Sequence, residues 1–432
     1  MLEFLDLRER GERLEATRLE IDPTVADTVA GILQRVFVEG DDVLIELCLR
    51  FDGADLTETG IMVTEAEFDR ADEDTPPELA EALDALIERL KSFHARQLPH
   101  EWRDEQDGVR FGEMVRPLAS VGCYVPGGRA VYPSSVCMTV VPAVVAGVEE
   151  IVVCTPPNAD GSVPAPVLYA ARRAGATYVA KTGGAQAVAA MAYGTESIPR
   201  VDRIVGPGNA YVTEAKRQVA GTVGIDGLAG PSELTIVADG TLDERLVALD
   251  LIAQAEHDPE ARTFFVTTSP ELVEAVDQAL ERAVRTAGRR EIIDTSLSYT
   301  KAVVVRDLDQ AAEVVDELAS EHVLVLLPDP ESFVAKIRNA GALFLGRATA
   351  VPFGDYGVAS NHVLPTAGTA RFSSGLRASD YVTVTSVVEL SDAAAARFAP
   401  STAEIAWAEG LVGHAKAMQS RAEAGAPEEV ES

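Results

Sequence analysis

The chain has 432 residues, of which 47% are hydrophobic, enough for a large buried core and for more than one domain. Its 69 acidic and 37 basic side chains give a net charge of −32, which argues against nucleic acid or an anionic membrane as a partner, since both attract positive surfaces. No apolar run approaches the roughly 18 residues that a membrane span needs, and the charged residues 1–10 are unlike a signal peptide, so we expect a cytoplasmic protein.

The acidic residues are spread along the chain, and lysine occurs at only six positions. Salt screens the self-repulsion of such a surface, so the composition suggests the salt-rich cytoplasm of a halophile. The four cysteines, at positions 48, 123, 137 and 154, form no C-x-x-C pair and lie among apolar neighbours. We therefore interpret them as small buried hydrophobic residues and not as zinc thiolates.

Residues 1–100 are predicted to be mostly helical. Apolar residues recur at helical spacing in residues 23–36 and again in residues 78–90. His94 and His100 follow the second of these helices, where a histidine usually complements the helix dipole. We assign these two histidines no chemistry.

From about residue 118, short apolar runs alternate with helical stretches, which is typical of βαβ units and a parallel sheet. The first series of predicted strands is 119–125, 151–155, 177–181 and 201–205, with predicted helices at 135–147, 164–174, 186–193 and 210–219. The second series of strands is 234–238, 263–268, 301–306, 323–327 and 342–345. The predicted fold class is α/β, with two tandem Rossmann-like parallel-sheet domains, a helical N-terminal segment and a small helical C-terminal extension. In that extension, residues 402–418 read as one amphipathic helix and residues 424–432 as a frayed acidic end.

Glycine-rich turns follow the predicted strands of the first series. They are Tyr-Val-Pro-Gly-Gly at 124–128, Gly-Gly-Ala-Gln at 183–186 and Gly-Pro-Gly-Asn at 206–209. Loops at the carboxyl ends of parallel strands bind ligands in α/β proteins, and helix N-termini there suit phosphate. None of the three is the G-x-G-x-x-G dinucleotide fingerprint, so on their own they indicate tight turns and ligand contacts equally well.

Four of the six histidines lie beside acidic or amide side chains. Gln254 and His257 are three apart near the end of a helix predicted to stop before Pro259, so they share a face, with Glu256 as a further candidate metal ligand. The four pairs are Gln254 and His257, Glu321 and His322, Asp355 and His362 in the polar loop 353–365, and Glu409 and His414 on the C-terminal helix. One such pair is usually a solvated helix end, whereas four together indicate a metal site with acid–base chemistry. Nitrogen and oxygen ligands suit zinc, manganese or cobalt.

These segments resemble the histidinol dehydrogenase family. The similar motifs are G-P-S-E at 230–233, Q-A-E-H-D at 254–258, E-H at 321–322, G-D-Y at 354–356, N-H-V-L-P-T at 361–366 and A-E-G-L-V-G-H at 408–414, together with the three glycine turns. The motifs keep the family's order and spacing from about residue 30 to about residue 420.

The resemblance implies a role for each matching residue. It implies a zinc ion bound by Gln254, His257, Asp355 and His414, the last coming from the other subunit of a homodimer that exchanges C-terminal segments. It implies acid–base roles for Glu321 and His322. The substrate contacts that it implies are Ser232, Gln254, His257, His322, Asp355, His362, Glu409 and His414, and the NAD contacts are Tyr124, Gln186 and Asn209.

The expected domains follow from this assignment. They are an N-terminal segment 1–22, an α/β domain of residues 23–123 and 232–376 that carries most metal and catalytic residues, an NAD-contacting domain 124–231, and an exchanged segment 377–432.

The reaction implied is the oxidation of L-histidinol through L-histidinaldehyde to L-histidine with two NAD, the last steps of histidine biosynthesis. An imidazole that titrates near neutral pH, His322, suits removal of the hydroxyl proton, and Glu321 suits activation of the water that hydrates the aldehyde. One alternative is a zinc hydrolase in which Glu321 activates a metal-bound water, although a hydrolase has no need of nucleotide loops. Another is a catalytically silent metal- or nucleotide-binding protein, against which the Glu321–His322 pair argues.

The acidic composition makes a prediction about salt. We expect the free energy of unfolding to rise with KCl concentration, because added ions screen the repulsion among the 69 acidic side chains. Denaturation by urea at a series of KCl concentrations measures this dependence. Full stability in dilute buffer would contradict the halophile hypothesis.

Overall fold

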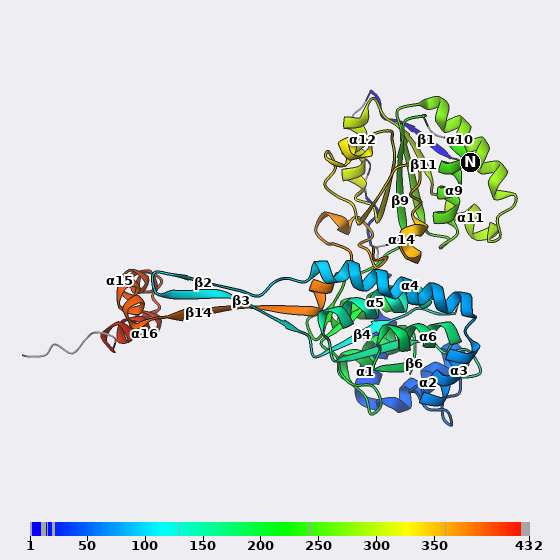
Figure 1. Cartoon of the computed structure of the whole chain (residues 1–432). Helices are drawn as coiled ribbons and strands as arrows, with labels where there is room; N and C mark the ends of the chain where they lie inside the picture. The colour runs from blue at the N-terminus through cyan, green and yellow to red at the C-terminus, as the bar shows by residue number, and fades with distance from the viewer. Residues whose placement is uncertain are drawn as a thin grey trace, which may run out of the picture. The chain divides into compact units, whose positions relative to one another are not determined.

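The computed structural model describes residues 2–9, 14, 16–19, 22–128, 130–241, 243–358 and 360–424. The chain divides into two compact units (Figure 1). The first consists of Met1–Gln97 and Leu118–Tyr381, and the second of Leu98–Pro117 and Val382–Ser432. The first unit holds two parallel sheets with helices on both faces, which confirms the α/β class.

The first parallel sheet has five strands in the order β6-β5-β4-β7-β8. Its strands are β4 (Ser120–Tyr124), β5 (Glu150–Thr155), β6 (Tyr178–Lys181), β7 (Arg203–Val205) and β8 (Gly224–Ile225). The connecting helices are α5 (Pro133–Ala146), α6 (Ala165–Ala174), α7 (Gly184–Tyr193) and α8 (Ala210–Val219). Strand β4 is buried throughout because both faces of the sheet carry helices, which explains its continuous apolar run.

Four N-terminal helices complete the cover of this sheet. They are α1 (Pro23–Glu39), α2 (Asp41–Asp52), α3 (Glu65–Asp74) and α4 (Pro77–His94), followed by a 3-10 turn at Ala95–Gln97. Helices α1 and α2 join α7 and α8 on one face, and α3 and α4 join α5 and α6 on the other. The prediction that residues 23–123 belong with residues 232–376 is therefore wrong for these helices, since their apolar faces pack on the five-stranded sheet.

The second parallel sheet has six strands in the order β1-β11-β10-β9-β12-β13. Its strands are β1 (Glu3–Asp6), β9 (Glu233–Ala238), β10 (Arg262–Thr267), β11 (Lys301–Val304), β12 (His322–Leu326) and β13 (Ala342–Leu345). Without β1, both sheets share one order, with the third, second, first, fourth and fifth strands side by side, as in a Rossmann half. The prediction of a helical N-terminus fails at β1, which pairs with β11 at the sheet edge.

Helices cover both faces of this sheet too. Helices α9 (Glu244–Ala255), α10 (Pro270–Val284) and α11 (Arg290–Leu297) pack on one face, and α12 (Leu308–Leu318) and α13 (Pro330–Val334) on the other. The chain then forms α14 (Pro352–Tyr356) and 3-10 turns at Thr369–Arg371 and Ala378–Tyr381. The nine strands predicted from the alternating pattern are all present, with ends within two residues of the prediction.

The second unit is an antiparallel sheet in the order β14-β3-β2 with two helices. Its elements are β2 (Trp102–Gln106), β3 (Val109–Pro117), β14 (Val382–Leu390), α15 (Asp392–Ala408) and α16 (Val412–Ala424). The predicted C-terminal segment 377–432 is thus not wholly helical, and it shares its sheet with residues 98–117. The single helix predicted at 402–418 breaks at Gly410, whose φ is +75°. Residues 425–432, most of the predicted acidic end, lie outside the described residues.

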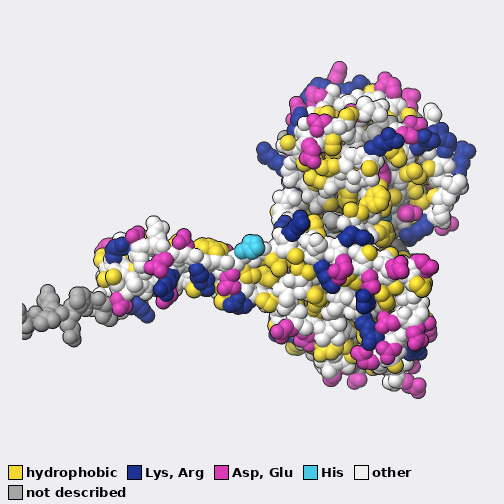
Figure 2. Space-filling model, in the orientation of Figure 1, with side chains coloured by type: hydrophobic (Ala, Val, Ile, Leu, Met, Phe, Trp, Pro, Cys, Tyr) yellow, Lys and Arg dark blue, Asp and Glu magenta, His cyan; other side chains and the backbone are white. Residues whose placement is uncertain are grey.

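Charged side chains cover the surface without a single basic patch on the face seen in Figure 2, where Asp and Glu are scattered among Lys and Arg. Several arginines lie among carboxylates, as Arg172 does with Glu65, Asp69 and Asp72. Within the part of the chain that the structure describes, no helix is long and apolar enough to span a membrane.

Gly206, directly after β7, marks a close approach of two backbones. Its φ is +112°, and a Cβ there would overlap the carbonyl oxygen of Tyr124, the last residue of β4. Gly221 has a similar φ of +97°, but nothing lies within 4 Å of a Cβ at that position.

This difference predicts the cost of two substitutions. We expect Gly221→Ala to lower the free energy of unfolding by about 1–2 kcal/mol, because only backbone strain is added. Gly206→Ala should cost about 1–3 kcal/mol more, because the β4 backbone must also move. Urea denaturation of both variants measures the difference. An equal loss of unfolding free energy in the two variants would show that the β4 backbone at Tyr124 accommodates the added Cβ without strain.

Candidate active site

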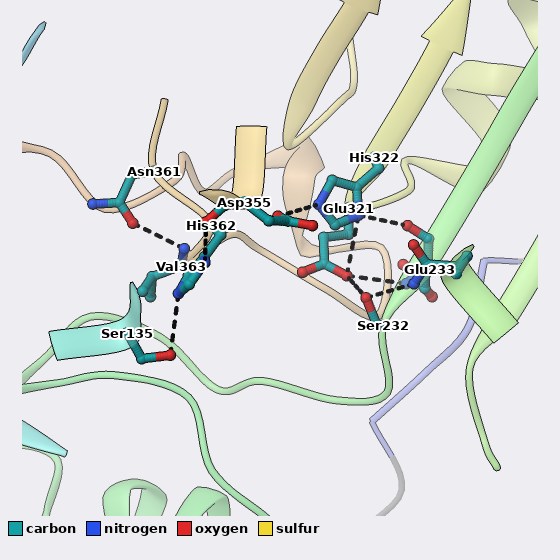
Figure 3. Close-up of polar contacts among 10 residues, drawn as sticks. Ser135, Ser232, Glu233, Glu321, His322, Asp355, Asn361, His362 and Val363 are labelled. Carbon is teal, nitrogen blue, oxygen red and sulfur yellow. Dashed lines mark hydrogen bonds and ion pairs between the residues drawn. The ribbon is translucent and has the colours of Figure 1, made fainter. Parts of the chain in front are cut away.

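The predicted acid–base residues lie at the amino ends of neighbouring strands. Ser232 directly precedes β9, and Glu321 directly precedes His322, the first residue of β12. The two strands are parallel neighbours in a register that pairs His322 with Leu234. This register places Glu321 beside the start of β9, where Figure 3 shows its carboxyl group pointing toward Ser232 and Glu233.

Glu321 is a buried carboxyl group that accepts two hydrogen bonds. The Ser232 hydroxyl donates to its Oε2 at 2.5 Å, and the backbone N–H of Glu233 donates to the same oxygen at 3.0 Å. Burial raises the pKa of Glu321 to about 7, although both hydrogen bonds lower it. Such a carboxyl group can take or give a proton near neutral pH.

His322 has one ring nitrogen held and the other without a hydrogen-bond partner (Figure 3). Its Nδ1 lies 3.2 Å from the carbonyl oxygen of Glu233, so Nδ1–H donates and the lone pair lies on Nε2. Nε2 is buried without a hydrogen-bond partner, 4.0 Å from Oδ1 of Asp355. Burial lowers the pKa of His322, which favours the neutral base.

The predicted metal ligands of the first unit lie on three segments around this pair. Gln254 is buried in α9, and its Nε2 donates a hydrogen bond to the Ser232 hydroxyl at 2.7 Å. Its Oε1 is then the atom that can bind a metal ion. His257 lies past the end of α9, so it does not share a helix face with Gln254 as predicted. Asp355 lies in α14 and not in a loop, and burial raises its pKa to about 6.

This donor set fits a zinc ion chemically. An amide oxygen, an imidazole and a carboxylate are hard or borderline ligands, and a cation would favour the ionised form of the buried Asp355. Desolvation by the surrounding protein lowers the pKa of His257, although part of the residue is exposed to solvent, so its imidazole is neutral and able to ligate. Within the described residues, no group of three His, Cys, Asp or Glu side chains is arranged to hold a metal.

His362 connects the site to the other sheet (Figure 3). Its Nδ1 lies 3.3 Å from the carbonyl oxygen of Asp355, and its Nε2 lies 3.2 Å from the hydroxyl of Ser135 in α5. Burial lowers the pKa of His362 to about 4, so its ring is neutral and Nδ1–H donates. Nothing in the sequence pattern pointed to Ser135 or to the Glu233 backbone, because both act through contacts far apart in the chain.

His94 supports the loop that carries His362. The buried ring contacts Oε1 of Gln97 through Nδ1 at 2.8 Å and the Asn361 amide through Nε2 at 3.3 Å. Asn361 in turn donates to the carbonyl oxygen of Met138 at 2.7 Å. These contacts give His94 a structural role in supporting the loop.

The predicted NAD residues belong to the five-stranded sheet. The Tyr124 hydroxyl accepts a hydrogen bond from the backbone N–H of Gly184 at 3.1 Å, and burial raises the Tyr124 pKa to about 12. Asn209 caps α8 and is exposed, whereas the Gln186 side chain is buried and does not line the pocket described next. A contact of Gln186 with NAD stays a prediction.

One open pocket brings the two groups of residues together. Its lining includes Tyr124 and Asn209 from the carboxyl edge of one sheet and Ser232, Glu321 and His322 from the amino edge of the other. Glu409 and His414 belong to the second unit, where both are exposed, Glu409 at the end of α15 and His414 in α16. Their part in the site stays a prediction.

A pocket that joins a buried acid, a neutral imidazole and glycine-rich strand ends on two Rossmann-like sheets defines an α/β enzyme with acid–base chemistry. The family model of histidinol dehydrogenase matches residues 15–422. The chain therefore belongs to the histidinol dehydrogenase family, oxidoreductases of histidine biosynthesis.

Individual relatives agree over nearly the full length. The chain is 45% identical to the histidinol dehydrogenase of Methanothermobacter thermautotrophicus, over 96% of this chain and 97% of that one. It is 46% identical to that of Halalkalibacterium halodurans, over 92% and 94%. The crystal structure of histidinol dehydrogenase from Elizabethkingia anophelis superposes with a TM-score of 0.93 at 30% identity, covering 98% of both chains.

The buried carboxyl group predicts a pH-dependent stability. Folded Glu321 keeps its proton up to about pH 7, whereas the unfolded chain releases it near the ordinary value of 4.5. Between these values the folded state binds more protons, so the contribution of Glu321 to the free energy of unfolding falls as the pH rises, by up to about 3 kcal/mol.

The metal-free Glu321→Gln variant should therefore be more stable than the metal-free parent at pH 8 and about equally stable at pH 5. Urea denaturation in the presence of a chelator measures both values. Glu260→Gln removes an exposed carboxylate that also lines the pocket and serves as the control. An equal effect of Glu321→Gln at both pH values would show that Glu321 ionises normally.

Proposed function

We propose that the protein is a zinc-dependent enzyme that oxidises L-histidinol to L-histidinaldehyde and then to L-histidine, using two NAD. The observation that carries the proposal is the Glu321–His322 pair, a buried acid whose pKa is about 7 next to an imidazole with a free Nε2. Family membership supports the substrate, and the glycine turns that line the pocket support a dinucleotide. We further propose that the protein works in the cytoplasm, and that this cytoplasm is rich in salt.

His322 would remove the hydroxyl proton in the first oxidation. The Glu233 carbonyl oxygen holds Nδ1–H, so Nε2 is the atom that can accept a proton. The nearby carboxylate of Asp355, 4.0 Å from Nε2, would stabilise the imidazolium that forms. NAD would accept the hydride from the carbinol carbon in this oxidation and again in the second.

Glu321 would serve the aldehyde stage. The aldehyde must add water before a second hydride can leave, and the ionised carboxylate would take a proton from that water. Ser232 and the Glu233 N–H occupy Oε2, so Oε1 is the oxygen left to accept it. Retention of the aldehyde in the pocket between the two steps would keep a reactive compound from solution.

Gln254, His257 and Asp355 would hold the zinc ion together with His414 of the other subunit. The ion would orient the substrate through its imidazole and amino nitrogens and contribute positive charge. The hydrogen bond from Gln254 Nε2 to the Ser232 hydroxyl would fix the orientation of the amide and leave Oε1 to bind the zinc ion. His362 and Glu409 would contact the substrate, and Tyr124, Gln186 and Asn209 would contact NAD.

The proposal is tested by incubating the zinc-loaded protein with histidinol and NAD and following absorbance at 340 nm. Formation of NADH supports the proposal, and two NADH per histidinol consumed support both oxidation steps. Histidinol consumption without NADH would favour the hydrolase class, and no consumption would favour a silent binding protein.

The base assignment predicts the effect of His322→Asn, which keeps a similar shape but cannot titrate. We expect kcat to fall by at least about a hundredfold, in the range for loss of a general base, with KM for histidinol little changed. His100→Asn, at an exposed histidine without an assigned role, is the matched control. Near-normal turnover of the His322→Asn variant would refute the assignment.

The exchanged C-terminal segment predicts complementation between two inactive variants. If His257 and His414 of one site come from different chains, a mixed dimer of His257→Ala and His414→Ala has one intact site and one that lacks both ligands. Random mixing makes about half of the dimers mixed, so about a quarter of the wild-type activity should return.

The measurement is to unfold and refold the two variants together and to assay NADH formation. Refolding of the unmodified protein under the same conditions is the control. Absence of recovery, with that control successful, would show that each site is built from one chain.

A further inference from the structure

The turn at 206–209 is held at its first residue by two buried charged side chains. The backbone N–H of Gly206 donates to Oδ2 of Asp226 at 2.7 Å, and Nζ of Lys216 donates to the Gly206 carbonyl oxygen at 3.1 Å. The backbone N–H of Gly206 is therefore bound by an anionic side chain and its carbonyl oxygen by a cationic one.

Lys216 and Asp226 also form an ion pair with each other. Their side chains are 3% and 8% exposed, so water screens the pair little. Oδ1 of Asp226 accepts a further hydrogen bond from the backbone N–H of Gly227 at 2.7 Å. The pair thus fastens three segments together: the turn after β7, helix α8 and the turn after β8.

The position of this turn leaves no room for a shift toward β4, since Gly206 packs directly on the Tyr124 carbonyl group. At its other end Asn209 caps α8, its Oδ1 accepting from the backbone N–H groups of Tyr211 and Val212. Asn209 is exposed, and the whole turn lines the pocket. Because Lys216 belongs to α8 itself, its bond to Gly206 fixes both where the turn begins and where the helix starts.

Stability alone does not explain a buried ion pair at this place. Desolvation of two charges offsets much of their attraction, and apolar replacements are often equally stable. Here the two charges instead fix the first residue of a turn whose other three residues, 207–209, are half-buried or exposed and line the pocket. The pair therefore has its largest effect on what the turn presents to a ligand.

We propose that Lys216 and Asp226 are positioning residues for the dinucleotide: they hold the 206–209 turn in the conformation that binds NAD. The inference rests on the proposed use of NAD. It assigns no contact with the reacting atoms to either residue, and it separates NAD binding from the acid–base chemistry at Glu321 and His322.

The test uses Lys216→Met, which keeps the aliphatic stem and removes the ammonium group, and Lys216→Arg, which keeps a cation that can reach both partners. The dissociation constant of NADH is measured by its fluorescence on the zinc-loaded protein without histidinol. We expect it to rise at least about tenfold in Lys216→Met, because loss of positioning costs affinity steeply, and to recover substantially in Lys216→Arg. KM for NAD should rise with it, while kcat and KM for histidinol at saturating NAD stay within about twofold.

Lys181→Met is the matched control. The Lys181 side chain is 1% exposed and pairs with Glu67 at 2.6 Å. Its replacement therefore also breaks an ion pair of a buried lysine beside the five-stranded sheet. Lys181, however, does not line the pocket. A merely structural role of Lys216 predicts that both variants lose stability and that neither changes NADH binding by the folded protein. That result, or equal NADH affinity of Lys216→Met and the parent, overturns the inference. If the parent protein itself binds no NADH and forms none from histidinol, the proposed function fails instead.

Discussion

The active site depends on the burial of one carboxyl group between the first residues of two neighbouring parallel strands. Burial raises the pKa of Glu321, and the hydrogen bonds from Ser232 and the Glu233 backbone limit that rise to about 7. Burial therefore favours the neutral acid, and the two donors favour the anion. The same strand start fixes His322, because the Glu233 residue that donates to Glu321 also accepts from the imidazole.

The two sheets have the same strand order, but the pocket is lined by the carboxyl ends of the strands in one and by the amino ends of the strands in the other. The glycine turns and Tyr124 lie at the carboxyl edge of the five-stranded sheet, where α/β proteins ordinarily bind ligands. Ser232 and Glu321 lie at the amino edge of the six-stranded sheet. The amino edge suits polar side chains that need rigid support, since each directly precedes a buried strand whose register is fixed on both sides. The pocket thus joins the strand ends proposed to bind the dinucleotide to the strand ends that carry the proposed acid–base pair.

The sequence predicted the buried parallel strands well, because a strand covered on both faces is a short continuous apolar run. It failed at β1, β2, β3, β8 and β14, which are partly or wholly exposed strands. The end of α9 at Ala255, before His257, was also missed, since the proline at 259 stops a helix without determining which residue is the last. The contacts of His362 with Ser135 and of Lys216 with Gly206 depend on tertiary packing, for which no local pattern exists.

We expect the carboxyl group of Glu321 to titrate near neutral pH because it is buried. Infrared difference spectra between the metal-free parent and the metal-free Glu321→Gln variant contain the carboxyl stretch of Glu321, and the same spectra of a Glu233→Gln variant identify the contribution of its neighbour, whose pKa is also raised to about 7. A pH series of these spectra measures the pKa of Glu321 directly. The protonated carboxyl signal of Glu321 should disappear with a midpoint at about pH 7. A midpoint near the ordinary value of 4.5 would contradict this expectation.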